Sequence, residues 1–200
     1  CLLTETPITI TFAKLNNRNR RSIRLAGYDY SRAGAYFVTV CVNSRQNLFG
    51  DIEDGKMALS DAGRMADKWW RELFEKYKEI EKDEYCVMPN HMHGIIQIVG
   101  ADLCVRPNND SCVRPHTPLG EHIGSPLHKM VQWFKTMSTN EYIRNVKNKN
   151  WLPFSKHFWQ RNYYEHVIRD DNDLNRIREY IVNNPAKWEE DEYYVAKTKT

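Results

Sequence analysis

The stretch of sequence that decides the fold is residues 88–99, MPNHMHGIIQIV. Its apolar residues predict a buried strand at about residues 84–99, and two histidines, His91 and His93, enter that apolar run. Side chains at positions i and i+2 of a strand share a face, so the two imidazoles should point together. Neutral imidazoles held side by side can bind a divalent metal ion. The competing interpretation places both rings at a strand end, solvated or bonded to backbone, and His-x-His alone does not exclude it.

Outside this strand, the sequence alternates between further strand and helix patterns. The predicted elements are a strand at 35–43, a hairpin at 48–59, helices at 61–79 and from 126, a strand-like aromatic segment at 158–168 and a helix at about 171–183. The last helix should stop at Pro185, because a proline disfavours helical geometry in the residue before it. This order of elements predicts an α+β fold, a ferredoxin-like sandwich with helices packed on a mainly antiparallel sheet.

Composition bounds the class of protein. The chain has 200 residues, of which 41% are hydrophobic, enough for one core. Charged residues make up 28%, and no window approaches the ~18 consecutive apolar residues of a membrane span. The five cysteines are an odd number without a Cys-x-x-Cys pair, which argues against a disulfide framework. We therefore expect a soluble cytoplasmic protein without a membrane partner.

The domain organisation follows from changes in composition. Residues 34–188 form the expected domain, preceded by a basic arm at 1–33 and followed by a C-terminal tail at 189–200. Residues 100–125 contain scattered prolines and glycines and a short repeated unit, Cys-Val-Arg-Pro. Such a stretch is typical of an exposed loop, here inserted into the domain.

Basic and aromatic residues suggest contacts with nucleic acid. The net charge of +3 is weak support, but four arginines crowd one short segment: Arg18, Arg20, Arg21 and Arg24. Such a run is either a solvated tail or an arm that follows a phosphate backbone. Further candidates for DNA contacts, by phosphate pairing or base stacking, are Lys129, Lys135, Trp159 and Arg161.

The last predicted helix carries a second pair of candidate residues. At 100° per residue, Tyr180 and Asn184 fall about 60° and 20° from Ile177 and about 40° from each other, so both should face the sheet. Taken alone, Tyr180 fits a core-edge tyrosine and Asn184 a helix terminator. Tyr163 and Tyr164 are rival tyrosines, but adjacent residues of an extended segment point to opposite faces, so at most one of them could reach the histidines.

These motifs together resemble a known family. MPNHMHGI at 88–95 and REYIVNNP at 178–185 resemble the REP-associated tyrosine transposases, relatives of the single-tyrosine HUH transposases of insertion sequence 200. Residues 22–30, 34–39, 48–50 and 159–164 also look like that family, so the resemblance spans roughly residues 20–188. It implies a metal-dependent single-stranded DNA endonuclease and strand transferase on a ferredoxin-like fold.

The resemblance also implies roles for single residues. His91, His93 and Asn184 would bind Mg²⁺ or Mn²⁺, and Tyr180 would attack DNA to form a 5′-phosphotyrosine. The DNA would be single-stranded or hairpin-bearing, as in REP elements. A tyrosine hydroxyl, with a pKa of about 10, is a poor nucleophile at neutral pH, so a nearby metal ion fits the chemistry.

Two other functions remain open on the sequence. The chain could be a non-catalytic ferredoxin-like module that binds single-stranded nucleic acid, in which case Tyr180 and Asn184 need not face the histidines. It could also be a replication-initiator nuclease of the wider HUH class, although the ending Asn183-Asn184-Pro185 favours the transposases. Both a monomer and a homodimer are compatible with the family.

Overall fold

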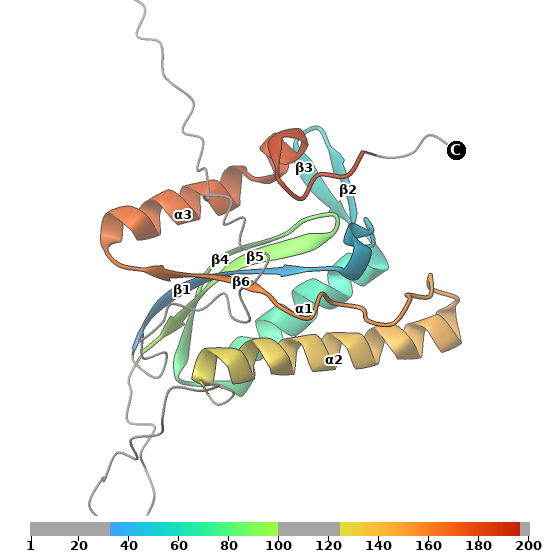
Figure 1. The fold of residues 1–200 in the computed structure, drawn as a ribbon, viewed down its shortest axis with the longest axis horizontal. Coiled ribbons are helices and arrows are strands. Elements are labelled where there is room, and N and C mark those ends of the chain that lie inside the picture. The colour runs from blue at the N-terminus through green and yellow to red at the C-terminus, as the bar shows by residue number, and fades with distance from the viewer. Residues whose placement is uncertain (1–32, 100–124, 197–200) are drawn as a thin grey trace, which may run out of the picture.

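The computed structural model describes residues 33–99 and 125–196 (Figure 1). Its strands are β1 Gly34–Cys41, β2 Gly50–Glu53, β3 Lys56–Leu59, β4 Ile80–Val87, β5 His91–Ile98 and β6 Tyr164–Ile168. Its α-helices are α1 Asp61–Lys76, α2 Pro126–Lys149 and α3 Asp171–Asn183, and two short 3-10 helices are η1 Asn43–Arg45 and η2 Pro185–Glu190.

The main sheet has the strand order β4-β5-β1-β6, and every neighbouring pair is antiparallel. The hairpin β2–β3 and helix α1 connect β1 to β4, and α2 connects β5 to β6. Helices α1 and α2 cover one face of the sheet, and α3 lies over the other (Figure 1). This arrangement confirms the predicted ferredoxin-like sandwich with an antiparallel sheet.

Alternation along the two central strands divides their side chains between the two faces. Tyr36, Val38 and Val40 of β1 join the larger core beneath α1 and α2, whereas Phe37 joins a smaller apolar cluster beneath α3. On β5, Gly94 faces α1, where a Cβ atom would lie 2.3 Å from Cζ2 of the buried Trp70. The missing side chain at position 94 therefore lets the indole of Trp70 pack directly on the sheet.

Serine side chains cap the starts of α1 and α2. The Ser60 hydroxyl accepts a hydrogen bond from the Gly63 amide (3.1 Å) at the start of α1. The Ser125 hydroxyl accepts one from the His128 amide (3.3 Å) at the start of α2, where Pro126 takes the first helical position. Within the described residues, no helix combines the length and the apolar character needed to cross a bilayer.

Two predictions about element boundaries were wrong. The strand predicted at about 84–99 is two antiparallel strands, β4 and β5, joined by a tight turn at 88–90 in which the Met88 amide donates to the His91 carbonyl (2.8 Å). Asn184 was expected to leave helical geometry before Pro185, but it keeps φ −58° and ψ −43°. The chain then continues as η2, since proline is well tolerated in a first helical turn.

Candidate metal and tyrosine site

The two histidines lie on the face of the sheet that α3 covers. His93 pairs with Thr39 and His91 with Cys41 across the β1–β5 ladder, and both imidazoles point to the same side of β5, as the i and i+2 spacing predicts. Their side chains are 0% and 1% exposed. Two buried imidazoles need partners for their ring nitrogens, because an unpaired buried polar group costs stability.

Asn90 fixes the tautomer of His91. The Asn90 amide nitrogen donates to the carbonyl oxygens of Arg45 (3.2 Å) and Tyr193 (2.9 Å), which orients its oxygen toward Nδ1 of His91 at 2.9 Å. A carboxamide oxygen only accepts, so Nδ1 carries the proton and Nε2 is left with its lone pair. Burial, followed by the neighbouring His93, lowers the pKa of His91 well below its usual value, so this ring is neutral at pH 7.

His93 is held in the same way from the neighbouring strand. The Thr39 hydroxyl lies 2.8 Å from Nδ1 of His93. The Nε2 atoms of the two histidines are 2.9 Å apart, so both unconstrained nitrogens converge on one point. Second partners of this kind orient metal-ligating imidazoles in proteins.

Two oxygen donors complete the cluster. One carboxylate oxygen of Asp191, Oδ2, lies 4.0 Å from Nε2 of His91 and 3.9 Å from Nε2 of His93. The same oxygen accepts a hydrogen bond from the Asn184 amide nitrogen (3.0 Å). The Asn184 oxygen is buried without a hydrogen-bond partner among the described residues. Two imidazole nitrogens, a carboxylate and an orphaned carbonyl oxygen form a donor set that suits a divalent cation.

The charge on Asp191 matches this environment. Burial alone would raise the pKa of its carboxyl, but the nearby imidazoles of His93 and His91 outweigh that effect and lower it to about 2. The Tyr193 amide also donates to this carboxylate (2.6 Å). Asp191 is therefore ionised and is held by backbone as well as by side chains.

Tyr180 reaches the same point from α3. Its hydroxyl lies 3.4 Å from Nε2 of His93, and its ring packs edge-on against Phe37 with the centroids 6.0 Å apart. Burial, and after it the negative charges of Asp191 and Glu192, raises the pKa of the Tyr180 phenol. The hydroxyl is thus protonated at neutral pH and needs an activated partner to act as a nucleophile.

The segment 191–195 covers the histidines. The Tyr193 ring packs against His91 with centroids 4.6 Å apart, and the Arg45 guanidinium lies 5.1 Å from the centre of the Tyr193 ring. The Arg45 side chain also donates to the Glu192 carbonyl (3.0 Å). These contacts close the imidazoles off from solvent.

The predicted DNA-contact residues lie in different surroundings. Arg18, Arg20, Arg21 and Arg24, and nearly all of the insertion at 100–125, fall outside the described residues. Lys129 and Arg161 are exposed. Lys135 is 7% exposed and donates to the carbonyls of Gln160, Arg161 and Asn162.

Trp159 is also buried, at 5% exposure. Its indole nitrogen donates to the Ser138 hydroxyl (2.9 Å), and its ring packs on Phe49 and Phe134. In this structure Lys135 and Trp159 are thus committed to internal packing, and neither side chain is presented to DNA.

The rival tyrosines divide as expected from their adjacent positions. Tyr163 packs on the side of α1 and α2, where the Lys135 ammonium lies 5.6 Å from its ring centre. Tyr164 packs beneath α3 against Phe37, with ring centroids 6.2 Å apart. Of these two, only Tyr164 shares the face of the histidines.

Sequence reasoning missed Asp191 and the two residues that orient the histidines. Asp191 falls in the segment set apart as a C-terminal tail, and no spacing rule links it to residues 100 positions earlier. Asn90 precedes His91 directly and Thr39 lies in a predicted strand, but their roles depend on a strand register that the sequence does not show.

Comparison with known proteins identifies the family of this chain. It belongs to the IS200-like transposase family: the model of that family, described as "Transposase IS200 like", matches residues 116–184. The matched range contains Tyr180 and Asn184, whereas His91 and His93 precede it.

Two proteins of one organism are similar to most of this chain. An uncharacterized protein of Haemophilus influenzae is 38% identical over 180 residues, covering 88% of this chain and 94% of its own. A second protein of that organism, named "Putative REP-associated tyrosine transposase", is 26% identical over 164 residues, covering 80% of this chain and 74% of its own.

A solved structure shares the fold. It is that of a REP-associated tyrosine transposase bound to a REP hairpin, which aligns with a TM-score of 0.50 at 20% identity and covers 80% of this chain and 72% of that one.

Proposed function

We propose that this transposase cleaves and rejoins single-stranded DNA through a covalent link to Tyr180, with the aid of a divalent metal ion, Mg²⁺ or Mn²⁺. The observation that carries this proposal is the convergence of the Tyr180 hydroxyl on the point where Nε2 of His91 and of His93 meet. Because a relative is named as a REP-associated transposase and a structural neighbour holds a REP hairpin, the substrate proposed is hairpin-bearing, REP-like DNA.

The residues that would hold the metal ion are His91, His93 and Asn184, with Asp191 as a further oxygen donor. When bound, the cation would withdraw charge from the scissile phosphate and so make its phosphorus more electrophilic. The orphaned oxygen of Asn184 and the neutral state of His91 support this assignment, since both offer lone pairs without first losing a proton. Asp191 supplies the type of ligand that Mg²⁺ prefers over imidazole.

The covalent step uses the hydroxyl of Tyr180. Its oxygen forms a bond to phosphorus while the bond from phosphorus to the 3′ oxygen of the preceding nucleotide breaks. The phenolic proton passes to the departing 3′ oxygen, directly or through water. The 5′-phosphotyrosine keeps the energy of the broken linkage, so a 3′ hydroxyl can reverse the step and rejoin DNA without another energy source.

Access to the site requires movement of the segment 191–195. Its Tyr193 ring covers His91, and the histidines are almost fully buried. A DNA phosphate can approach the histidines only when this segment is displaced from the position it takes here. The Asn184–Asp191, Asn90–Tyr193 and Arg45–Glu192 hydrogen bonds are among the contacts that such a displacement would break.

The test is to trap and map the covalent adduct. The protein is incubated with hairpin-bearing single-stranded oligonucleotides from the flanks of its own gene, with and without Mn²⁺. We expect a protein–DNA band that Tyr180→Phe abolishes, because the substitution removes only the attacking oxygen. Tyr164→Phe, on the same face of the sheet, is the matched control and should keep the band. A nucleotide mapped by mass spectrometry to Tyr164, or an undiminished band in Tyr180→Phe, would refute the assignment.

A further inference from the structure

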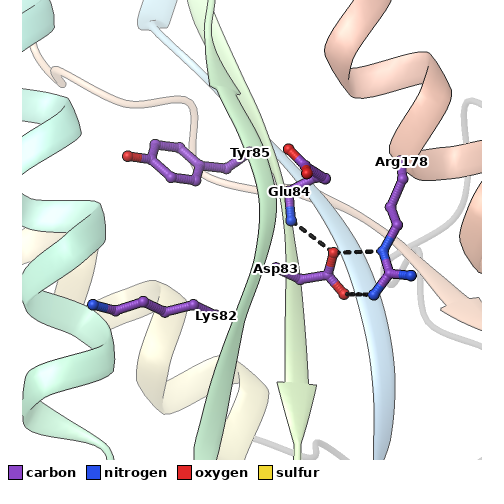
Figure 2. Close-up of a pocket in the computed structure, with 5 residues that line it drawn as sticks. All are labelled: Lys82, Asp83, Glu84, Tyr85 and Arg178. Atoms are coloured by element: carbon purple, nitrogen blue, oxygen red, sulfur yellow. Dashed lines mark hydrogen bonds and ion pairs between the residues drawn. The ribbon is translucent and has the colours of Figure 1, made fainter.

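A second polar contact ties α3 to the sheet on the flank opposite Tyr180. The register of β4 against β5 shifts between Lys82 and Tyr85, and within this irregularity Asp83 points toward α3. Figure 2 shows Asp83 facing Arg178, with Lys82 and Tyr85 on the other side of the strand. The guanidinium of Arg178 donates from Nε to Oδ1 and from Nη2 to Oδ2 of Asp83, each at 2.8 Å. Two parallel bonds of this kind fix orientation as well as distance.

The carboxylate of Asp83 is a rigid anchor. Its side chain is 3% exposed, and besides Arg178 it accepts hydrogen bonds from the Glu84 amide (2.7 Å) and from the side-chain amide of Gln97. Gln97 belongs to β5, the strand that carries the histidines. The anchor for α3 is therefore built into the same pair of strands as the histidine site.

The apolar contact beneath α3 is narrow. Ile177 and Ile181 are the buried residues of the helix, and they pack on Phe37 and Ile95. These two isoleucines, flanked by the partly buried Leu174 and Tyr180, set the distance of α3 from the sheet. A directional polar contact at the flank of the helix adds a constraint on its rotation that apolar packing alone does not supply.

The ion pair and the nucleophile flank these isoleucines. At 100° per residue, Arg178 lies about 100° to one side of Ile177 and Tyr180 about 60° to the other. Holding Arg178 on β4 thus fixes the angle at which Tyr180 leans toward His93. Among the described residues, α3 has two other ion pairs. Arg176 with Asp173 joins two residues of the helix itself and cannot do this. Asp173 with His166 (2.8 Å) joins the helix to β6, but it lies about 40° from Ile177 on the side of Tyr180, so it leaves the opposite flank to Arg178 and Asp83.

We propose that the Asp83–Arg178 pair is a positioning device that sets the rotation of α3 and so aims the Tyr180 hydroxyl at the histidine site. The proposal rests on the function proposed above, with Tyr180 as the nucleophile. Arg178 acts only through the helix and contacts neither the histidines nor the reacting oxygen in the described contacts. Misplacement of a reacting group by about 1 Å can cost on the order of 10²-fold in rate, so loss of the Asp83–Arg178 pair should slow the covalent step.

The experiment compares Arg178→Met with Arg176→Met in the full chain. Both variants remove a guanidinium from α3, but only the first removes a direct contact between the helix and the sheet. With saturating hairpin oligonucleotide and Mn²⁺, the rate of adduct formation in Arg178→Met should fall by at least about tenfold, toward the 10²-fold expected for misplacement. DNA affinity should change by no more than it does in Arg176→Met.

A second readout needs neither metal nor DNA. The rings of Tyr180 and His93 lie 5.3 Å apart by their centroids, so a nuclear Overhauser contact between them should be visible in the wild-type protein. We expect it to weaken in Arg178→Met and to persist in Arg176→Met. Contacts between Trp70 and Phe134, on the far side of the sheet, report in each variant that the fold is intact.

The outcomes separate this proposal from the function on which it rests. If Arg178→Met forms the adduct as fast as Arg176→Met and keeps the ring contact, the positioning role is wrong. If the wild-type chain forms no adduct on Tyr180, the proposed function fails. The contact between the rings of Tyr180 and His93 then still decides whether the Asp83–Arg178 pair orients the helix. If Arg178→Met does not fold, Arg178→Lys, which keeps the charge but has a single donor group, decides by the same two readouts.

Discussion

The two faces of the sheet are built for different purposes. The face beneath α1 and α2 is apolar and closely packed, and the indole of Trp70 fills the space left by Gly94. The face beneath α3 has a small apolar cluster, of which Phe37 and Ile95 are the fully buried strand members. Its remaining area carries the two buried histidines and their partners.

This difference separates stability from chemistry within one sheet. Hydrophobic stabilisation grows with the apolar area removed from water, so most of it comes from the face of α1 and α2. Burying imidazoles, a carboxylate and an amide costs stability unless each group is paired, and the α3 face leaves one oxygen, that of Asn184, unpaired. Strands β1 and β5 serve both purposes at once, because alternate residues point to opposite faces. Changes on one face should therefore affect folding, and changes on the other should affect metal binding and cleavage.

The largest effect is expected from His91→Ala on the α3 face. Loss of one of few metal ligands should reduce metal-dependent cleavage of hairpin oligonucleotides by orders of magnitude, and calorimetric titration with Mn²⁺ should show weakened binding. Circular dichroism should show a folded protein, since the large core is untouched. His157→Ala, at an exposed position, is the control and should behave as wild type. Undiminished cleavage by His91→Ala would remove this residue from the metal site.

The opposite face should respond in stability. In Gly94→Ala the new Cβ would lie 2.3 Å from Trp70, which is fully buried and cannot move aside. Overpacking of this kind costs about 1–3 kcal/mol, and the rigid indole predicts the upper end. Gly34→Ala is the matched control, because its Cβ would meet only Tyr36, at 3.7 Å or more. Urea unfolding measures both, and equal midpoints for the two variants would contradict this packing.

The sequence predicted the parts of this molecule that depend on local patterns. Strand periodicity placed His91 and His93 on one face, and helical periodicity brought Tyr180 and Asn184 to the sheet. The hairpin of β4 and β5 was missed because the residues on both sides of Pro89 and Asn90 are strand-like, so the whole stretch was taken for one strand. Asp191 could not be predicted, since its place depends on how the chain folds back after η2.

At two positions the residue type suggested a contact with DNA, but the structure shows a buried side chain. Lysine and tryptophan suit contacts with phosphates and bases, but the side chains of Lys135 and Trp159 are buried in the described part of the structure. Lysine is rarely buried unless its ammonium is paired, and here three carbonyls that converge through tertiary structure supply the partners. No local sequence pattern predicts that a lysine will be buried against three carbonyls.

Lys135 and Lys129 provide a test of this distinction on a single helix. Burial lowers the pKa of Lys135 to about 8, and Lys135→Met should cost about 1–2 kcal/mol, because the carbonyls of 160–162 lose their donor. The salt dependence of DNA binding should stay unchanged. Lys129→Met, at an exposed position, should leave urea unfolding unchanged and, if Lys129 contacts a phosphate, reduce the salt slope by about 1. A reduced salt slope in Lys135→Met would show that Lys135 does contact a DNA phosphate.

The smallest effect concerns the charge of Asp83, which holds α3 to the sheet. Burial alone would raise the pKa of this carboxyl, but the bonds from Arg178 and from the Glu84 amide outweigh it, and the pKa in the folded protein lies below its ordinary value. A carboxyl with a depressed folded pKa stabilises the protein above its unfolded pKa, and this stabilisation is lost as the pH falls through the folded value. The free energy of unfolding should therefore be lower in Asp83→Asn than in wild type by about 1 kcal/mol at neutral pH, a modest value because Arg178 is partly solvated. This difference should shrink as the pH falls below about 4, when the unfolded carboxyl and then the folded one take up protons.

Glu75→Gln is the control. The pKa of Glu75 is also lowered, chiefly by its hydrogen bond with Lys78, but the group is exposed. Its difference from wild type should therefore be smaller at every pH. Urea unfolding between pH 3 and 7 measures both variants. A difference for Asp83→Asn that stays constant over this range would show that the pair holds α3 through shape and not through charge.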